Sequence, residues 1–292
     1  MTTTRDATSR PLVSTQWLAD HLGGDDLVLL DASVAAYRQP DGRSGFLSGH
    51  EEYILVGHIP GAVFADVIES LSDPDGAYPF TRPSAERFAA EIGALGVGGE
   101  TTVVVYDSAV GQWAARVRWL LRSFGHERVV VLDGGLTKWR AEGRVLETGH
   151  VAPVERTFEA VPQPGFWAEK ADVERVLTGD DDAVLVCATP PREFTGEESS
   201  RARAGHIPGS VSVPAGRLVD RESNAVLRDE ALRTALGDVA EAPKVIAYCG
   251  GGIAATAAAL AIEIAGGGPV AVYDGSLNEW AADSDAPLVV TA

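Results

Sequence analysis

The stretch GHIPGAV at residues 57–63 recurs almost unchanged as GHIPGSV at residues 205–211, which indicates that the chain repeats itself. Three further pairs follow the same order: 27–33 (LVLLDAS) with 183–189 (AVLVCAT), 103–107 (VVVYD) with 245–249 (VIAYC), and 129–139 (VVVLDGGLTKW) with 270–280 (VAVYDGSLNEW). One match arises easily by chance, whereas four matches in register do not. The chain therefore contains a duplicated domain of about 140 residues.

Each half alternates two kinds of segment. Short apolar runs at 26–32, 101–107 and 128–134 are typical of buried parallel strands. Helical patterns such as 84–95 (SAERFAAEIGAL) and 113–124 (WAARVRWLLRSF) lie between them. This alternation predicts an α/β fold with a parallel sheet in each half.

A proline-containing stretch without helical period separates the halves. We place the first domain at 11–146, a linker at 147–164 and the second domain at 165–292.

Cys249 ends the apolar run 244–248 (KVIAY), and three glycines follow it before an alanine-rich tract. Open α/β sheets hold their sites at the carboxyl ends of strands, and we expect a helix to begin near 254–258. Glycines let such a loop visit positive φ and turn its N–H groups inward. Those N–H groups and the positive end of the helix favour a thiolate. The pattern predicts a nucleophile in an anion-binding nest.

The alternative is a structural thiol, since free cysteine often acts as a small apolar residue. The repeat argues against this, because the position that matches Cys249 in the first half holds Asp107. A structural cysteine has no reason to stand where its counterpart carries a carboxylate. We therefore expect the first domain to be an inactive copy and the second to be catalytic.

Composition narrows the partners. The 292 residues carry 42 acidic and 24 basic side chains, a net charge of −18. Such a surface repels phosphate backbones and anionic lipids, so we expect neither nucleic acid nor a membrane as partner. Two cysteines and no CxxC pair fit a reducing cytoplasm. The first 13 residues lack the apolar core of a secretion signal.

These motifs resemble the two-domain rhodanese family: GHIPG in both halves, the stretch 111–135 (GQWAARVRWLLRSFGHERVVVLDGG), and a second-half cysteine that opens a short loop. The resemblance covers roughly residues 12–280. It implies tandem rhodanese-like domains, each a parallel sheet flanked by helices. It also implies thiosulfate or 3-mercaptopyruvate sulfurtransferase activity.

The resemblance implies a mechanism as well. Cys249 attacks a sulfane sulfur and becomes a persulfide, from which an acceptor such as cyanide or a thiol removes the sulfur. The family's active-site loop corresponds to Gly250, Gly251, Gly252, Ile253 and Ala254. Its N–H groups stabilise the charge that develops, and the ping-pong reaction needs no metal or other cofactor.

Two arginines and one histidine resemble the family's substrate-binding residues. Arg192 and Arg201 have the spacing of the pair that holds a donor carboxylate, for which the planar guanidinium is suited. Arg203 is the substitute if the alignment is shifted. His58 resembles a histidine that reaches the site from the other domain, whereas its counterpart His206 is expected to fix its own turn. The alternative for the arginines is a solvated role beside nearby glutamates, and for His58 a structural role.

The loop CGGGIA lacks the basic residues that hold a sulfonate dianion, which favours 3-mercaptopyruvate as donor; thiosulfate is the alternative. It also lacks the serine and threonine of mercaptopyruvate-type loops, because Gly251 and Ala254 stand there. Cys187 replaces the family's usual aspartate, and we expect a buried, inert thiol; a sulfur relay with Cys249 is the alternative.

Two other classes of protein compete with this interpretation. A cysteine phosphatase or arsenate reductase needs an arginine six residues after the cysteine, where Ala255 stands. A non-catalytic sulfur carrier or regulatory module would bind one sulfur without turnover. The acceptor itself, a small thiol, cyanide or a protein such as thioredoxin, is left open by the sequence.

Overall fold

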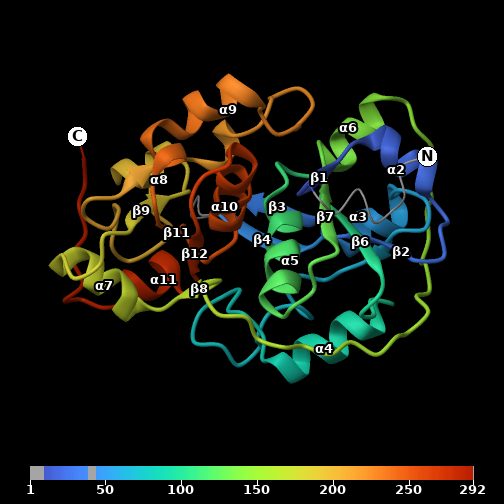
Figure 1. Cartoon of the computed structure of the whole chain (residues 1–292), viewed down its shortest axis with the longest axis horizontal. Coiled ribbons are helices and arrows are strands. Elements are labelled where there is room, and N and C mark those ends of the chain that lie inside the picture. Colours follow the sequence, from blue (N-terminus) through green and yellow to red (C-terminus); the bar gives the residue numbers. More distant parts are fainter. Residues whose placement is uncertain (1–9, 39–43, 292) are drawn as a thin grey trace.

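The computed structural model describes residues 10–38 and 44–291, which form two α/β units side by side (Figure 1). The first unit is built on a five-stranded sheet that is parallel throughout. Its strands, in spatial order, are β1 (Leu12–Val13), β7 (Val129–Leu132), β6 (Thr102–Tyr106), β2 (Leu27–Asp31) and β5 (Val63–Phe64).

The second unit repeats this sheet, again with five parallel strands. Its strands, given from the opposite edge, are β10 (Val211–Ser212), β9 (Val184–Cys187), β11 (Val245–Tyr248), β12 (Val270–Tyr273) and β8 (Trp167–Ala168). Each strand occupies the place of its repeat partner, so β11 corresponds to β6. The predicted α/β fold with two parallel sheets is confirmed.

Helices flank both sheets. In the first unit they are α2 (Thr15–His21), α3 (His50–Leu55), α4 (Ala85–Ala94), α5 (Gln112–Ser123) and α6 (Gly135–Ala141). In the second they are α7 (Lys170–Thr178), α8 (Pro191–Thr195), η1 (Ala215–Arg217), α9 (Asp229–Leu236), η2 (Gly237–Glu241), α10 (Ala254–Ala265) and α11 (Ser276–Trp280).

The predicted helix 84–95 is observed as α4, and its ends follow from the sequence. The Ser84 side chain accepts a hydrogen bond from the backbone N–H of Arg87 and so satisfies a donor that the first turn leaves free. The helix presents Phe88 and Ile92, both fully buried and four residues apart, to the core of the first unit.

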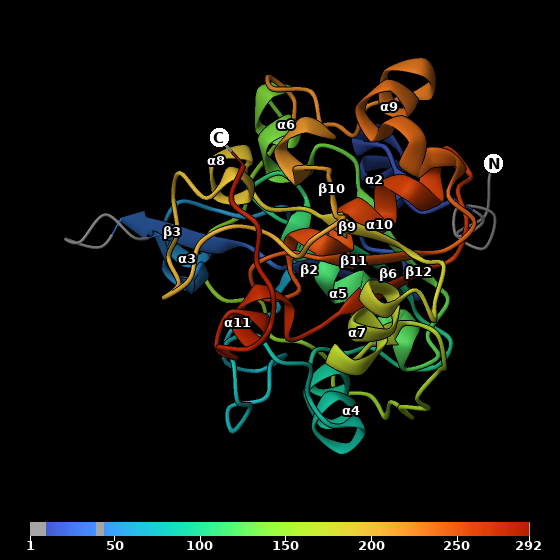
Figure 2. The same cartoon turned by 90° about the vertical axis from the view of Figure 1, so that its left-hand side faces the viewer.

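The first unit carries an antiparallel hairpin, β3 (Val34–Arg38) and β4 (Ser44–Ser48), after its strand β2. Among the described residues the second unit has no hairpin at the matching place, where α8 follows β9. Figure 2 shows β3 projecting at one side of the molecule. Phe46 of β4 makes edge-to-face contacts with Phe80 and Trp113, which tie the hairpin to the boundary between the units.

The two units share packing through α5 and α10, which lie side by side at the centre of Figure 1. Leu260 of α10 belongs to the apolar core of the first unit, and Trp119 of α5 to that of the second. Arg118 of α5 donates two 2.8 Å hydrogen bonds to the Glu263 carboxylate of α10. This packing fixes the two sheets relative to each other.

Residues 147–164 form no helix or strand, but they pack on the first unit. Glu147 pairs with His58 through two backbone hydrogen bonds of 2.9 Å. Phe158 is buried and makes an edge-to-face contact with Phe88. The segment predicted as a linker is thus fastened to the first unit over much of its length.

Candidate active site

A cavity of about 510 Å³ lies between the two units at the carboxyl end of β11. The second unit contributes Cys249 and its loop, the segment around α8, and Asn278 of α11. The first unit contributes an aromatic wall. The lining residues are Tyr37, Gly45, Phe46, Pro79, Phe80, Gln112, Trp113, Thr189, Pro190, Glu193, Ser200, Arg201, Cys249, Gly250, Gly251, Ile253, Ala254 and Asn278.

Cys249 lies at the base of this cavity and is only 4% exposed. The fully buried Ser276 holds its loop, because the Ser276 hydroxyl accepts hydrogen bonds from the backbone N–H groups of Cys249 (3.2 Å) and Gly252 (3.1 Å). The same hydroxyl donates to the carbonyl of Tyr273 at 2.7 Å. The loop is therefore anchored from behind, and its open side faces the cavity.

The loop retains donors for an anion. The backbone N–H groups of Gly250, Gly251, Ile253 and Ala254 have no protein acceptor among the described residues. Gly252 has a φ of +74°, a conformation that favours glycine, whereas a Cβ at Gly251 would lie 2.8 Å from the end of the Asn278 side chain, which can move. The helix α10 begins at Ala254, as predicted, and adds the positive end of its dipole.

The matching loop of the first unit shows what such a nest holds. The Asp107 carboxylate accepts hydrogen bonds from the backbone N–H groups of Ala109 (2.8 Å), Gly111 (3.0 Å), Trp113 (2.9 Å) and Ala114 (3.1 Å). Burial raises the pKa of the Asp107 carboxyl, and these four donors oppose that shift. In this copy the chain supplies its own acceptor, so the nest is closed to a ligand.

Arg201 is the candidate anion-binding residue that the structure brings to Cys249. Its side chain is 16% exposed and lines the cavity. The Nε atom donates to Asn278 Oδ1 at 3.1 Å, and Nη1 donates to Glu193 Oε2 at 3.0 Å. A Cβ at Gly250 would collide with Nη2, so this nitrogen lies directly against the loop.

Arg192 is placed differently. Its side chain is 65% exposed, its guanidinium pairs with Glu197 (3.2 Å) and Glu198 (2.8 Å), and it does not line the cavity. Successive residues of a helix point about 100° apart, so in α8 the neighbouring Glu193 faces the cavity instead. Of the two arginines in the predicted clamp, the structure brings only Arg201 to the site.

His58 is fully buried inside the first unit and does not line the cavity. Its Nδ1 lies 3.0 Å from the carbonyl of Tyr53, and its ring stacks on that tyrosine. His206 has the same environment in the second unit, with Nδ1 2.8 Å from the carbonyl of Phe194 and its ring stacked on Phe194. Both histidines thus fix their own GHIPG turns. For His58 this is the structural role given as the alternative, whereas the prediction was that its side chain reaches the active site.

Cys187 is fully buried, and burial raises the pKa of its thiol. Its sulfur lies 3.2 Å from the Thr189 hydroxyl, and it packs in a different apolar cluster from Cys249. Arg203 donates to the carbonyls of Asp283 and Ala286, which holds the C-terminal segment in place. Neither residue lines the cavity.

The first unit also supports the loop of Cys249 from below. Arg116 of α5 is 1% exposed, donates to the Gly252 carbonyl at 3.3 Å, and forms an ion pair with Asp274 at 2.8 Å. Its Nη2 donates to the carbonyl of Phe80 at 2.7 Å. The site is therefore assembled from both units.

Ser276, Asn278, Glu193 and Arg116 were not predicted from the sequence. One signal was available: Ser276 stands where the first repeat has Gly135. Both residues have positive φ, +49° for Ser276 and +52° for Gly135. A serine in a conformation that favours glycine is strained, and such strain often marks a functional position.

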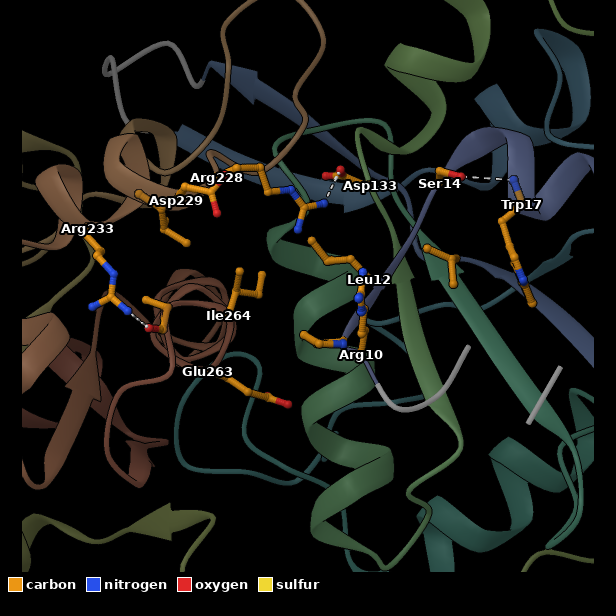
Figure 3. Close-up of a pocket in the computed structure, with 14 residues that line it drawn as sticks. Arg10, Leu12, Ser14, Trp17, Asp133, Arg228, Asp229, Arg233, Glu263 and Ile264 are labelled. Carbon is orange, nitrogen blue, oxygen red and sulfur yellow. Dashed lines mark hydrogen bonds and ion pairs between the residues drawn. The ribbon is translucent and has the colours of Figure 1, made fainter. Parts of the chain in front are cut away.

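A second, larger cavity of about 960 Å³ lies between the units (Figure 3). Several of its charged side chains are bonded to neighbours: Arg228 pairs with Asp133 at 2.6 Å, and Arg233 donates to the carbonyl of Ala265 at 2.9 Å. Glu263 points to Arg118 and Arg122. No cysteine or histidine within residues 10–38 and 44–291 lines it, so the smaller cavity is the candidate active site.

Within the described part of the chain, no group of three or more histidine, cysteine or acidic side chains is arranged to hold a metal ion. No helix there has the length and apolar character needed to cross a membrane.

The fold and the cavity define a tandem α/β protein whose second unit holds Cys249 at the end of β11, in a loop with open backbone N–H groups. The Rhodanese-like domain model matches residues 14–142 and 168–283. The chain belongs to the rhodanese family.

Similar proteins carry sulfurtransferase names. The 3-mercaptopyruvate sulfurtransferase of Escherichia coli K12 is 35% identical over 280 residues, covering 94% of this chain and 96% of its own. The thiosulfate sulfurtransferase of Gallus gallus is 34% identical and covers 94% of each chain. The crystal structure of SseA from Escherichia coli aligns with a TM-score of 0.80 and 34% identity, over 91% of this chain and 98% of that one.

Proposed function

We propose that this protein is a sulfurtransferase that moves a sulfane sulfur from 3-mercaptopyruvate to a thiophilic acceptor through a persulfide on Cys249. One observation carries the proposal: the nest that Asp107 fills in the first unit is open in the second and has Cys249 at its base. The relatives with sulfurtransferase names, similar over nearly the whole chain, support the same reaction.

In the first half-reaction the Cys249 thiolate attacks the sulfur of the donor. The thiolate electron pair forms the S–S bond, and the C–S pair leaves with the carbon as the enolate of pyruvate. The proton of the donor thiol ends on that carbon, so the products are pyruvate and the persulfide anion. The N–H groups of Gly250, Gly251, Ile253 and Ala254 are placed to stabilise the persulfide charge.

In the second half-reaction cyanide or a thiol attacks the outer sulfur. The S–S bond breaks, its electron pair returns to Cys249, and thiocyanate or a new persulfide leaves. No oxidant or reductant is consumed. Arg201 binds the donor carboxylate, while Arg192 and His58 have no part in this mechanism because they lie away from the cavity.

The partners follow from this chemistry. We propose a small anionic donor, and as acceptor cyanide or a thiol, thioredoxin included. Thiosulfate is the alternative donor, supported by the similarity to the Gallus gallus enzyme. Both cysteines are free thiols, which supports the proposal that the protein acts in a reducing cytoplasm.

The test compares the wild type with Cys249→Ser, using 3-mercaptopyruvate and thiosulfate as donors and cyanide as acceptor. We expect turnover in the wild type, a higher kcat/KM for 3-mercaptopyruvate, and no turnover in the variant with an unchanged circular dichroism spectrum. Activity in Cys249→Ser would refute the mechanism. One bound sulfur per chain without turnover would show a sulfur carrier instead.

A further inference from the structure

The charge inside the active-site cavity is balanced by the chain itself. Among the described residues, Glu193 and Arg201 are the only charged side chains that line the cavity. They form an ion pair, with Arg201 Nη1 3.0 Å from Glu193 Oε2. Apart from the sulfur of Cys249, the described lining therefore carries no net charge without a ligand.

Two of the five N–H donors of Arg201 are already bonded to protein acceptors. Its Nε atom is bonded to Asn278 and its Nη1 to Glu193. Nη2, the nitrogen beside Gly250, has no acceptor among the described residues. Bidentate binding of a carboxylate needs two adjacent donors of one guanidinium. A donor carboxylate that binds Nη1 and Nη2 therefore lies beside the Glu193 carboxylate and shares Nη1 with it.

The position of Glu193 follows from α8. The side chain of Arg192 points to solvent and that of Phe194 packs on His206, so the helix turns Glu193 toward the cavity. The Glu193 side chain is 26% exposed and has no other cation beside it among the described residues. Its carboxylate thus acts on one guanidinium and on whatever anion approaches Cys249.

We propose that Glu193 is a specificity-determining residue: it competes with the sulfur donor for Arg201 and selects donors of low negative charge. This inference rests on the proposed function and refines it. Repulsion by a fixed carboxylate scales with the charge of the donor. Thiosulfate, a dianion, is therefore disfavoured more strongly than 3-mercaptopyruvate, which carries one carboxylate.

Glu193→Gln tests the proposal, because the amide oxygen still accepts from Arg201 while the negative charge is gone. If each unit of donor charge gains about threefold in binding, KM falls about threefold for 3-mercaptopyruvate and about tenfold for thiosulfate. Glu241→Gln is the matched control. It also removes one carboxylate from an arginine pair, that with Arg233, but at an exposed position away from the cavity.

A second measurement does not depend on turnover. The rate of Cys249 alkylation is followed by mass spectrometry with iodoacetate, an anion, and with iodoacetamide, its neutral analogue. We expect the iodoacetate-to-iodoacetamide rate ratio to rise about threefold in Glu193→Gln and to stay unchanged in Glu241→Gln. Cys187 is fully buried and gives a separate peptide, so it does not confuse the reading.

The two measurements separate the hypotheses. A wild type that turns over neither donor defeats the proposed function, yet the alkylation ratio still tests Glu193. An unchanged ratio in Glu193→Gln overturns the inference. A lower ratio, or a higher KM for both donors, also overturns it, because Glu193 would then serve to position Arg201.

Discussion

Asp107→Ala probes the nest in the copy that carries its own anion. The carboxylate accepts four backbone hydrogen bonds of 2.8–3.1 Å, two of them from Trp113 and Ala114 in the first turn of α5. A hydrogen bond to a charged group contributes about 1.5–3 kcal/mol. Four bonds to one carboxylate are not additive, and water can enter the vacated space. We therefore expect a loss of about 3–5 kcal/mol in the free energy of unfolding.

This loss corresponds to a fall in Tm of about 5–8 °C for a chain of this length, measured by circular dichroism. Asp107→Asn keeps one oxygen but turns an NH₂ group toward two donors, so its Tm should lie between those of the wild type and Asp107→Ala. Formate at about 0.1 M should fill the vacated nest and raise the Tm of Asp107→Ala only. A loss below about 1 kcal/mol, or no effect of formate, would refute the view that these loops are anion nests.

Arg201→Ala should raise KM for the donor at least tenfold, because it loses a charge-assisted hydrogen bond worth about 1.5–3 kcal/mol. Arg192→Ala should leave this KM unchanged, and equal effects of the two variants would contradict the placement of the two side chains. Cys187→Ser should leave the kcat of sulfur transfer and its recovery after peroxide treatment unchanged, and a loss in either would revive a relay with Cys249. Glu263→Gln should lower the free energy of unfolding by about 1–2 kcal/mol at neutral pH, because it breaks the pair with Arg118. Burial disfavours the charged form of Glu263, but Arg118 and Arg122 outweigh this effect and hold its pKa below the ordinary 4.5. The extra stability of the wild type is therefore present above pH 4.5 and is lost as the pH falls through the pKa of the folded state. Urea titrations across acid pH would show this loss, and a stability difference that does not depend on pH would contradict it.

Much of the fold was predictable because the same order of strand and helix patterns occurs in both halves of the sequence. Apolar runs fixed the strands, and Ser84 marked the start of α4. The hairpin β3–β4 was not predicted. Its sequence has no counterpart in the second half, and it is held by contacts of Phe46 with the distant Phe80 and Trp113. Such long-range packing leaves no local signal.

The position of Cys249 was also predictable, because a strand end, three glycines and a helix start lie in one short stretch of the sequence. The charged side chains that face Cys249 were not predictable. Arg192 and Glu193 are adjacent in the chain, and only the orientation of α8 decides that the carboxylate enters the cavity while the guanidinium meets solvent. The structure places His58 away from the predicted site for a similar reason, because its ring stacks on Tyr53 inside the first unit.

The sequence alone predicts the duplicated α/β fold and the position of Cys249 in its glycine loop, because strand periodicity and glycine conformation act over a few residues. Only the tertiary structure decided the chemistry around that cysteine. Arg116 crosses from the first unit to hold Gly252, and Glu193 balances Arg201. Electrostatic interactions act through space between groups that are distant in the chain, so their balance is fixed when the two units pack together.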